Sequence, residues 1–217
     1  EGTMGGSDAA TLLLSLLALG VGALAVYGDA RGPRQLYYVT KPLATSLILV
    51  VAILRCPLRP AVGLWIIIGL GCALAGDVLL MLPRDRFVAG LTCFLLAQGA
   101  YICAFTSESA LLGPLWALAP SLLLLALLGL AVLPRAGAMR APVAIYGLVI
   151  ATMAWRALTR HLALDATHTL LGVLGAWLFV ASDLSLAWGR FVRRAAWLPI
   201  FCLSSYYLAQ ILIALSI

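Results

Sequence analysis

The chain has 217 residues, of which 64% are hydrophobic and only 10% are charged. A soluble domain needs far more polar surface, so this composition excludes a soluble globular protein and predicts a polytopic membrane protein. The net charge is +6, but the basic residues lie between apolar runs, where they set topology, so we expect no nucleic-acid surface. The five cysteines show no metal-ligand spacing, and the sequence predicts no disulfide frame, metal site or cofactor.

The first seven residues resemble a cloning remnant ahead of, or around, a native start at Met4, and we expect residues 8–217 to form one transmembrane domain. The first apolar run has no basic segment before it, which favours a retained helix over a cleaved signal peptide. A helix needs about 20 apolar residues to span the hydrocarbon core. Eight runs reach or approach this length, at about 9–27, 37–54, 61–82, 87–106, 111–133, 141–158, 168–188 and 197–216.

These runs predict an all-α bundle of eight transmembrane helices. The connections are too short to hold a soluble domain, so any chemistry must lie within the bundle. Ten basic residues lie in or beside the odd-numbered connections and four lie on the opposite side, which predicts cytoplasmic odd connections and non-cytoplasmic termini, in a membrane expected to be the bacterial inner membrane. The ten are Arg31, Arg34, Lys41, Arg84, Arg86, Arg135, Arg140, Arg190, Arg193 and Arg194, and the four are Arg55, Arg59, Arg156 and Arg160.

Two aspartates, Asp77 and Asp183, lie late in long apolar runs, each directly after a small residue. A carboxylate at the centre of a membrane helix costs about 2.5–3.5 kcal/mol on insertion scales, so such residues usually face an interior site. Both lie about 8 Å inside the same predicted face, at 1.5 Å of rise per residue. The alternative is that each aspartate only forms a hydrogen bond to a neighbouring helix. Because of the cost of burying a carboxylate, we treat the pair as the candidate catalytic residues.

The two halves of the chain show a weak similarity to each other. Residues 75–78 (Ala-Gly-Asp-Val) resemble residues 181–184 (Ala-Ser-Asp-Leu), and the offset of 106 (183 − 77) also carries Tyr101 onto Tyr207. This pattern is compatible with two four-helix units related by a parallel repeat.

Further polar residues fall within the predicted membrane depth. Lys41 and Tyr146 lie near the cytoplasmic starts of their helices, and five others lie deeper, so we expect one polar cavity open to the cytoplasmic leaflet. Lys41 could instead extend to the headgroups, the tyrosines could be packing residues, and the glutamines could join helices. Arg156, near the opposite face, is expected to be an anchor. The five deeper residues are Gln98, Tyr101, Tyr206, Tyr207 and Gln210.

A set of short motifs runs in order from the second to the eighth predicted helix. They are Thr40-Lys41-Pro42-Leu43, Gly76-Asp77-Val78-Leu79-Leu80, the spaced series Phe87, Gly90, Phe94, Gln98, Tyr101 and Phe105, Tyr146-Gly147-Leu148 with Met153-Ala154-Trp155-Arg156, Ser182-Asp183-Leu184-Ser185-Leu186-Ala187, and Tyr206-Tyr207-Leu208-Ala209-Gln210. With these motifs the chain resembles the YhhN-type integral-membrane family, which includes the eukaryotic lysoplasmalogenases. Gln98 stands where this resemblance leads us to expect a histidine.

The resemblance implies hydrolysis of the vinyl ether bond of a lysoplasmalogen, with release of a fatty aldehyde and glycerophosphoethanolamine or glycerophosphocholine. A vinyl ether hydrolyses by protonation of its β carbon, and the resulting cation resembles the one that paired carboxylates serve in glycosidases. Asp77 and Asp183 would divide the roles of acid and stabiliser, in either order, with support from Lys41, Gln98, Tyr101, Tyr146, Tyr207 and Gln210. A proton-coupled transporter of lipids or small molecules is the alternative, since paired intramembrane acids would suit it too. The expected partners are a lysophospholipid and the bilayer, and oligomeric state is left open.

Overall fold

A computed structural model describes residues 4–82, 86–110 and 113–217 of the chain. Eight helices in these ranges are long and apolar enough to cross a membrane, and no β-strand occurs in them. The predicted class, an all-α bundle of eight transmembrane helices, is confirmed. Arg84, which contributes to the charge bias, lies outside the described residues, as do residues 1–3 of the suspected cloning remnant.

The helices follow the predicted apolar runs closely at six of the eight positions. Their bounds are α1 Met4–Ala30, α2 Arg34–Arg55, α3 Pro60–Met81, α4 Phe87–Thr106, α5 Ala119–Leu127, α6 Arg140–Leu164, α7 Thr167–Phe191 and α8 Trp197–Leu215.

The fifth and sixth spans differ most from the prediction. The fifth begins with a 3-10 turn at Leu115–Leu118, continues as α5, and ends in a π-helical turn at Leu128–Val132. Pro134 follows this turn and cannot donate a backbone hydrogen bond, so a regular α-helix cannot continue there. The sixth span, α6, is six residues longer at its end than predicted (164 against 158), because Arg160 is paired inside the bundle.

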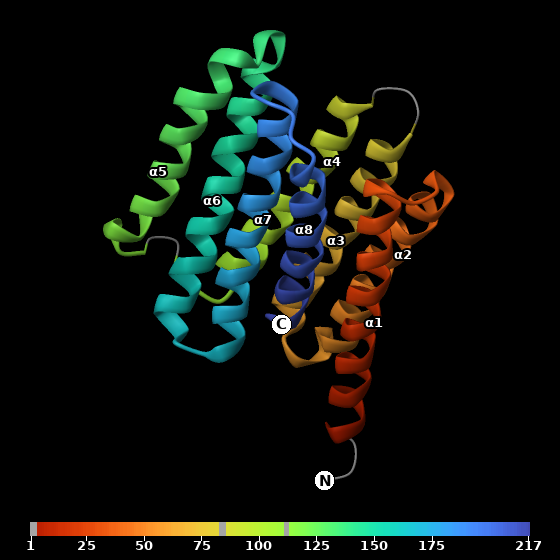
Figure 1. Cartoon of the computed structure of the whole chain (residues 1–217). Helices are drawn as coiled ribbons and strands as arrows, with labels where there is room; N and C mark the ends of the chain where they lie inside the picture. Colours follow the sequence, from red (N-terminus) through yellow and green to blue (C-terminus); the bar gives the residue numbers. More distant parts are fainter. Residues whose placement is uncertain (1–3, 83–85, 111–112) are drawn as a thin grey trace.

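The helices pack mainly as antiparallel pairs, α1 with α2, α3 with α4 and α7 with α8 (Figure 1). Helix α8 also contacts α1, α2 and α3, so it joins the two ends of the chain, whereas α5 lies at the outer side of α6. A β carbon on Gly175 of α7 would lie 2.9 Å from the Ala209 carbonyl oxygen of α8. The two backbones therefore approach closely, as small residues allow in membrane bundles.

A polar cluster fastens the end of the bundle where the even-numbered connections lie. Glu108, just after α4, forms ion pairs with Arg160 of α6 (2.7 Å) and with Arg59 (2.8 Å). Arg160 is only 1% exposed and also donates to the Ser216 carbonyl at the end of α8. Arg156, predicted to be an anchor near this face, is 3% exposed and donates to Thr106 at the end of α4 and to Ser109 and Ala110 just after it.

Acid is expected to weaken this cluster. Partial burial would raise the pKa of Glu108, but hydrogen bonds from Arg160 and Arg59 outweigh it and lower the pKa below its ordinary value of 4.5. The stability that the cluster contributes is therefore present above the unfolded-state pKa and is lost as the pH falls through the folded-state pKa. Glu108→Gln should destabilise the detergent-solubilised protein by about 1–3 kcal/mol at neutral pH.

Thermal unfolding of wild type and Glu108→Gln should show this difference shrinking as the pH falls below the ordinary Glu108 pKa of 4.5. Asp8→Asn, at an exposed position near the start of α1, is the control and should follow wild type. A difference that stays constant across this pH range would contradict the assignment.

Candidate active site

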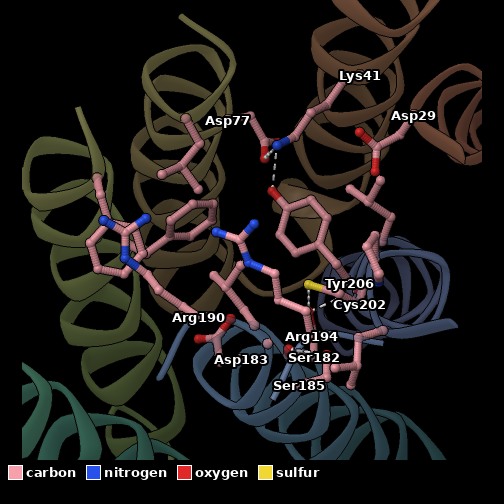
Figure 2. A pocket seen from close by; sticks show the side chains of 18 of the residues that line it. Asp29, Lys41, Asp77, Ser182, Asp183, Ser185, Arg190, Arg194, Cys202 and Tyr206 are labelled. Carbon is pink, nitrogen blue, oxygen red and sulfur yellow. Dashed lines mark hydrogen bonds and ion pairs between the residues drawn. The ribbon is translucent and has the colours of Figure 1, made fainter. Parts of the chain in front are cut away.

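A cavity of about 470 Å³ opens at the end of the bundle that carries the α1–α2, α3–α4 and α7–α8 connections. Its walls come from α1, α2, α3, α4, α7 and α8, so residues from both ends of the chain meet there. Asp77 and Asp183 both line it, from opposite sides in Figure 2. The two aspartates therefore face one common cavity.

Asp77 of α3 is 1% exposed and is surrounded by donors. Its Oδ1 lies 3.3 Å from Lys41 Nζ, and its Oδ2 accepts hydrogen bonds from the hydroxyls of Thr45 and Tyr206, both at 2.7 Å. An adjacent cation and several donors stabilise a carboxylate. Asp77 is thus held as a buried anion, and Lys41 is its counter-ion.

Three residues of α2 face this carboxylate because of their spacing. Tyr37, Lys41 and Thr45 lie four residues apart and so share one helix face. Lys41 Nζ donates to the Tyr37 hydroxyl at 3.3 Å and lies 5.5 Å from the centre of its ring. Tyr37 and Thr45 were not predicted as site residues, although their spacing of four from Lys41 was a usable signal.

Asp183 of α7 has a simpler environment. It accepts a hydrogen bond from the hydroxyl of Tyr146 on α6, and no ion pair joins it to any basic residue in the described ranges. The neighbouring Ser182 points elsewhere, since its hydroxyl donates to the Cys202 carbonyl of α8 at 2.9 Å. Asp183 and Tyr146 also line a smaller cavity between α4, α6 and α7. The two aspartates therefore share a cavity but differ in electrostatic surroundings.

Four of the predicted supporting residues lie behind the cavity wall. Tyr101 donates to the Gln210 side-chain oxygen at 2.7 Å, and both are buried, as are Gln98 and Tyr207. None of the four lines the cavity, whereas Tyr206, the neighbour of Tyr207, does. These four residues form a second layer behind the wall, in which the Tyr101–Gln210 hydrogen bond joins α4 to α8.

Aromatic rings fix the position of Tyr206. Its ring meets Phe94 and Phe179 edge to face, at centroid distances of 5.9 and 5.7 Å. A β carbon on Gly76 would lie 2.8 Å from the Phe94 ring, so the glycine before Asp77 leaves room for that ring. The ring packing of three helices thus orients a direct partner of Asp77.

Further polar residues of the cavity were not predicted as site residues, namely Asp29, Ser182, Ser185, Arg190, Arg194 and Cys202. Asp29 and the two arginines lie near helix ends. Charged residues are common at the ends of membrane helices, so hydropathy does not mark these three as unusual. Within the described ranges, no group of three or more His, Cys, Asp or Glu side chains is placed to hold a metal ion.

The fold and this cavity define a polytopic membrane protein with paired carboxylates at a site inside the bundle. The YhhN family model matches residues 36–217, and the chain belongs to that family. The resemblance drawn from the motifs is confirmed. No solved structure shows a significant match to the chain.

Individual relatives carry two kinds of name. The chain is 34% identical over 156 residues to lysoplasmalogenase TMEM86B of Rattus norvegicus, which covers 70% of this chain and 61% of the relative. It is also 34% identical over 159 residues to human lysoplasmalogenase TMEM86A, covering 70% and 64%. A protein of Escherichia coli O6:H1 named uncharacterized membrane protein YhhN is 34% identical over 123 residues, covering 56% and 58%. The chain thus spans roughly three fifths of the length of the relatives it matches.

Proposed function

We propose that this protein is a membrane lysoplasmalogenase, which hydrolyses the vinyl ether bond of a lysoplasmalogen to a fatty aldehyde and a glycerophospho-alcohol. The names of the relatives support the reaction class. The observation that carries the proposal is the unequal pair of aspartates on one cavity. Asp77 has a cation and two hydroxyl donors, whereas Asp183 has one hydroxyl partner.

From this inequality we infer the two roles. Asp183, which forms no ion pair with a basic residue in the described ranges, is the better proton donor of the two and acts as the general acid toward the β carbon of the vinyl ether. Asp77, held as an anion by Lys41, stabilises the oxocarbenium-like cation that forms. Tyr146 and Tyr206 orient the two carboxyl groups through their hydrogen bonds.

The remaining steps restore the proton balance. Water adds to the α carbon of the cation and gives up a proton to the Asp183 carboxylate. The product of this addition is a hemiacetal. The hemiacetal then breaks its bond to the glycerol oxygen, and the proton of the hemiacetal hydroxyl passes to that oxygen as the aldehyde leaves. One water is consumed, and both carboxyl groups end in their starting states.

We place the cavity mouth at the cytoplasmic leaflet of a bacterial inner membrane, following the excess of basic residues at that end. A lysophospholipid has one chain and a large headgroup, so it could enter from that leaflet with its headgroup at the mouth.

Detergent-purified protein should release aldehyde from lysoplasmenylethanolamine, measured by coupling to alcohol dehydrogenase and NADH. The saturated 1-O-alkyl lipid is the matched control, because it lacks the double bond that is protonated, and it should give no aldehyde. The transporter alternative predicts no aldehyde from either lipid and substrate movement only in sealed vesicles. Absence of aldehyde from pure, folded protein would contradict the proposed enzyme activity.

A further inference from the structure

Three charged residues of the cavity have no part in the chemistry above. Asp29 lies at the end of α1, Arg190 near the end of α7, and Arg194 in the connection to α8, and all three line the cavity. Figure 2 shows Asp29 on the side of α1 and α2 and the two arginines on the side of α7. They lie nearer the open end of the bundle than the two aspartates and need a separate explanation.

Of the two arginines, Arg194 is the one suited to bind an anion. Arg190 is stacked on the ring of Phe87, with its guanidinium carbon 3.8 Å from the ring centre. The side chain of Arg194 reaches into the cavity in Figure 2, and no hydrogen bond or ion pair joins it to the described part of the chain. Lys41 is already neutralised by Asp77. A phosphate group in this cavity would therefore meet an arginine, whose planar donors match its oxygens.

Asp29 supplies the opposite charge at the same opening. It is exposed, lines the cavity, and forms no ion pair shorter than 4 Å with a described residue. A carboxylate accepts hydrogen bonds from a primary ammonium group, which a quaternary ammonium cannot donate.

The apolar side of the cavity fixes which way a lipid would lie. The smaller cavity between α4, α6 and α7 shares Leu80, Phe87, Phe94, Asp183 and Leu186 with the main one. At about 40 Å³ the smaller cavity is too small for an alkyl chain. The chain would instead lie along the apolar residues of the main cavity beside Asp183, with the headgroup at the opening.

We propose that Arg194 binds the phosphodiester of the substrate and that Asp29 binds its primary ammonium group, so that the cavity selects zwitterionic ethanolamine lysophospholipids. This inference rests on the proposed function for the identity of the lipid chain. Asp77 and Lys41 neutralise each other, whereas neither Arg194 nor Asp29 forms an ion pair with a residue in the described ranges, so the two together complement a phosphate joined to an ammonium group.

Binding of saturated 1-O-alkyl lipids, which cannot be cleaved, tests the headgroup separately from the reaction. Isothermal titration of detergent-purified protein would compare three headgroups: phosphoethanolamine, phosphate alone, and free glycerol. Arg194→Gln should weaken binding of both phosphate lipids about tenfold and leave the alkylglycerol unchanged. Asp29→Asn should weaken only the phosphoethanolamine lipid, by about three- to tenfold.

Arg193→Gln is the matched control, because it removes the same charge from the same connection at an exposed residue that does not line the cavity. Its affinities should equal those of wild type. Equal losses of affinity in Arg193→Gln and Arg194→Gln would show an effect of general surface charge and would overturn the proposal. An unchanged affinity of Asp29→Asn for the phosphoethanolamine lipid would also overturn it. The expected binding pattern without any aldehyde release would keep the headgroup site and reject the lysoplasmalogenase function. Aldehyde release without that binding pattern would keep the lysoplasmalogenase function and reject the headgroup site.

Discussion

Asp183→Asn is expected to lower aldehyde release by about 100- to 10,000-fold, the range that a positioned general acid contributes. The amide has nearly the shape of the carboxyl group and can still accept the hydrogen bond from Tyr146, so the fold should persist. The loss should appear in kcat with little change in affinity for the saturated 1-O-alkyl lipid. The coupled aldehyde assay and lipid titration measure the two quantities.

Protonation of the β carbon can also be detected as an isotope label in the product. An aldehyde formed in D2O and reduced at once by alcohol dehydrogenase should carry one deuterium on the carbon next to the former carbonyl. Asp8→Asn, far from the cavity, should behave as wild type in both measurements. Near-normal turnover by folded Asp183→Asn would remove Asp183 from the mechanism, whatever the fate of Asp77.

Lys41→Met should both destabilise the protein and abolish activity. Lys41 and Asp77 side chains are only 6% and 2% exposed, so removing the cation leaves a buried carboxylate without its counter-ion. Breaking a buried pair from one side costs about 3–5 kcal/mol. Thermal unfolding of the detergent-solubilised protein should show a clearly lower midpoint, and aldehyde release should be lost.

The double variant Lys41→Met/Asp77→Asn separates stability from function. With both charges gone, the polar mismatch is smaller, so stability should recover toward wild type, while activity stays lost because the stabilising anion is missing. Arg31→Met removes an exposed charge near the same end and is the control for net charge. A Lys41→Met protein as stable as wild type would show that the pair does not hold Asp77 as an anion in the fold.

Composition and apolar run length determined the class, the helix count and most helix bounds, because a spanning helix must satisfy its own backbone and present apolar side chains to lipid. Asp77 and Asp183 were predictable for a related reason, since charge is costly wherever it falls inside such a run. The fifth span was less predictable, because Pro120 and Pro134 changed its helical geometry without changing its hydropathy.

The rotation of each helix about its axis could not be predicted from hydropathy, as α8 illustrates. Tyr206 and Tyr207 are adjacent and lie at nearly the same depth, so hydropathy treats them alike. In the structure the Tyr206 hydroxyl bonds to Asp77, whereas the Tyr207 ring packs where a β carbon on Gly22 of α1 would lie 2.9 Å away. Neighbouring residues on a helix point about 100° apart, and contacts with α1 and α3 decide which one faces the site.

The sequence by itself determined that two costly carboxylates lie at matching depth in an eight-helix membrane protein. Only the tertiary structure decided that they share one cavity, that Lys41 pairs with Asp77, and that Asp183 has Tyr146 as its hydroxyl partner. Depth follows from the spacing of residues along a single helix. Partnership depends on the rotation and packing of helices far apart in the chain, which side-chain volumes and close glycine contacts set.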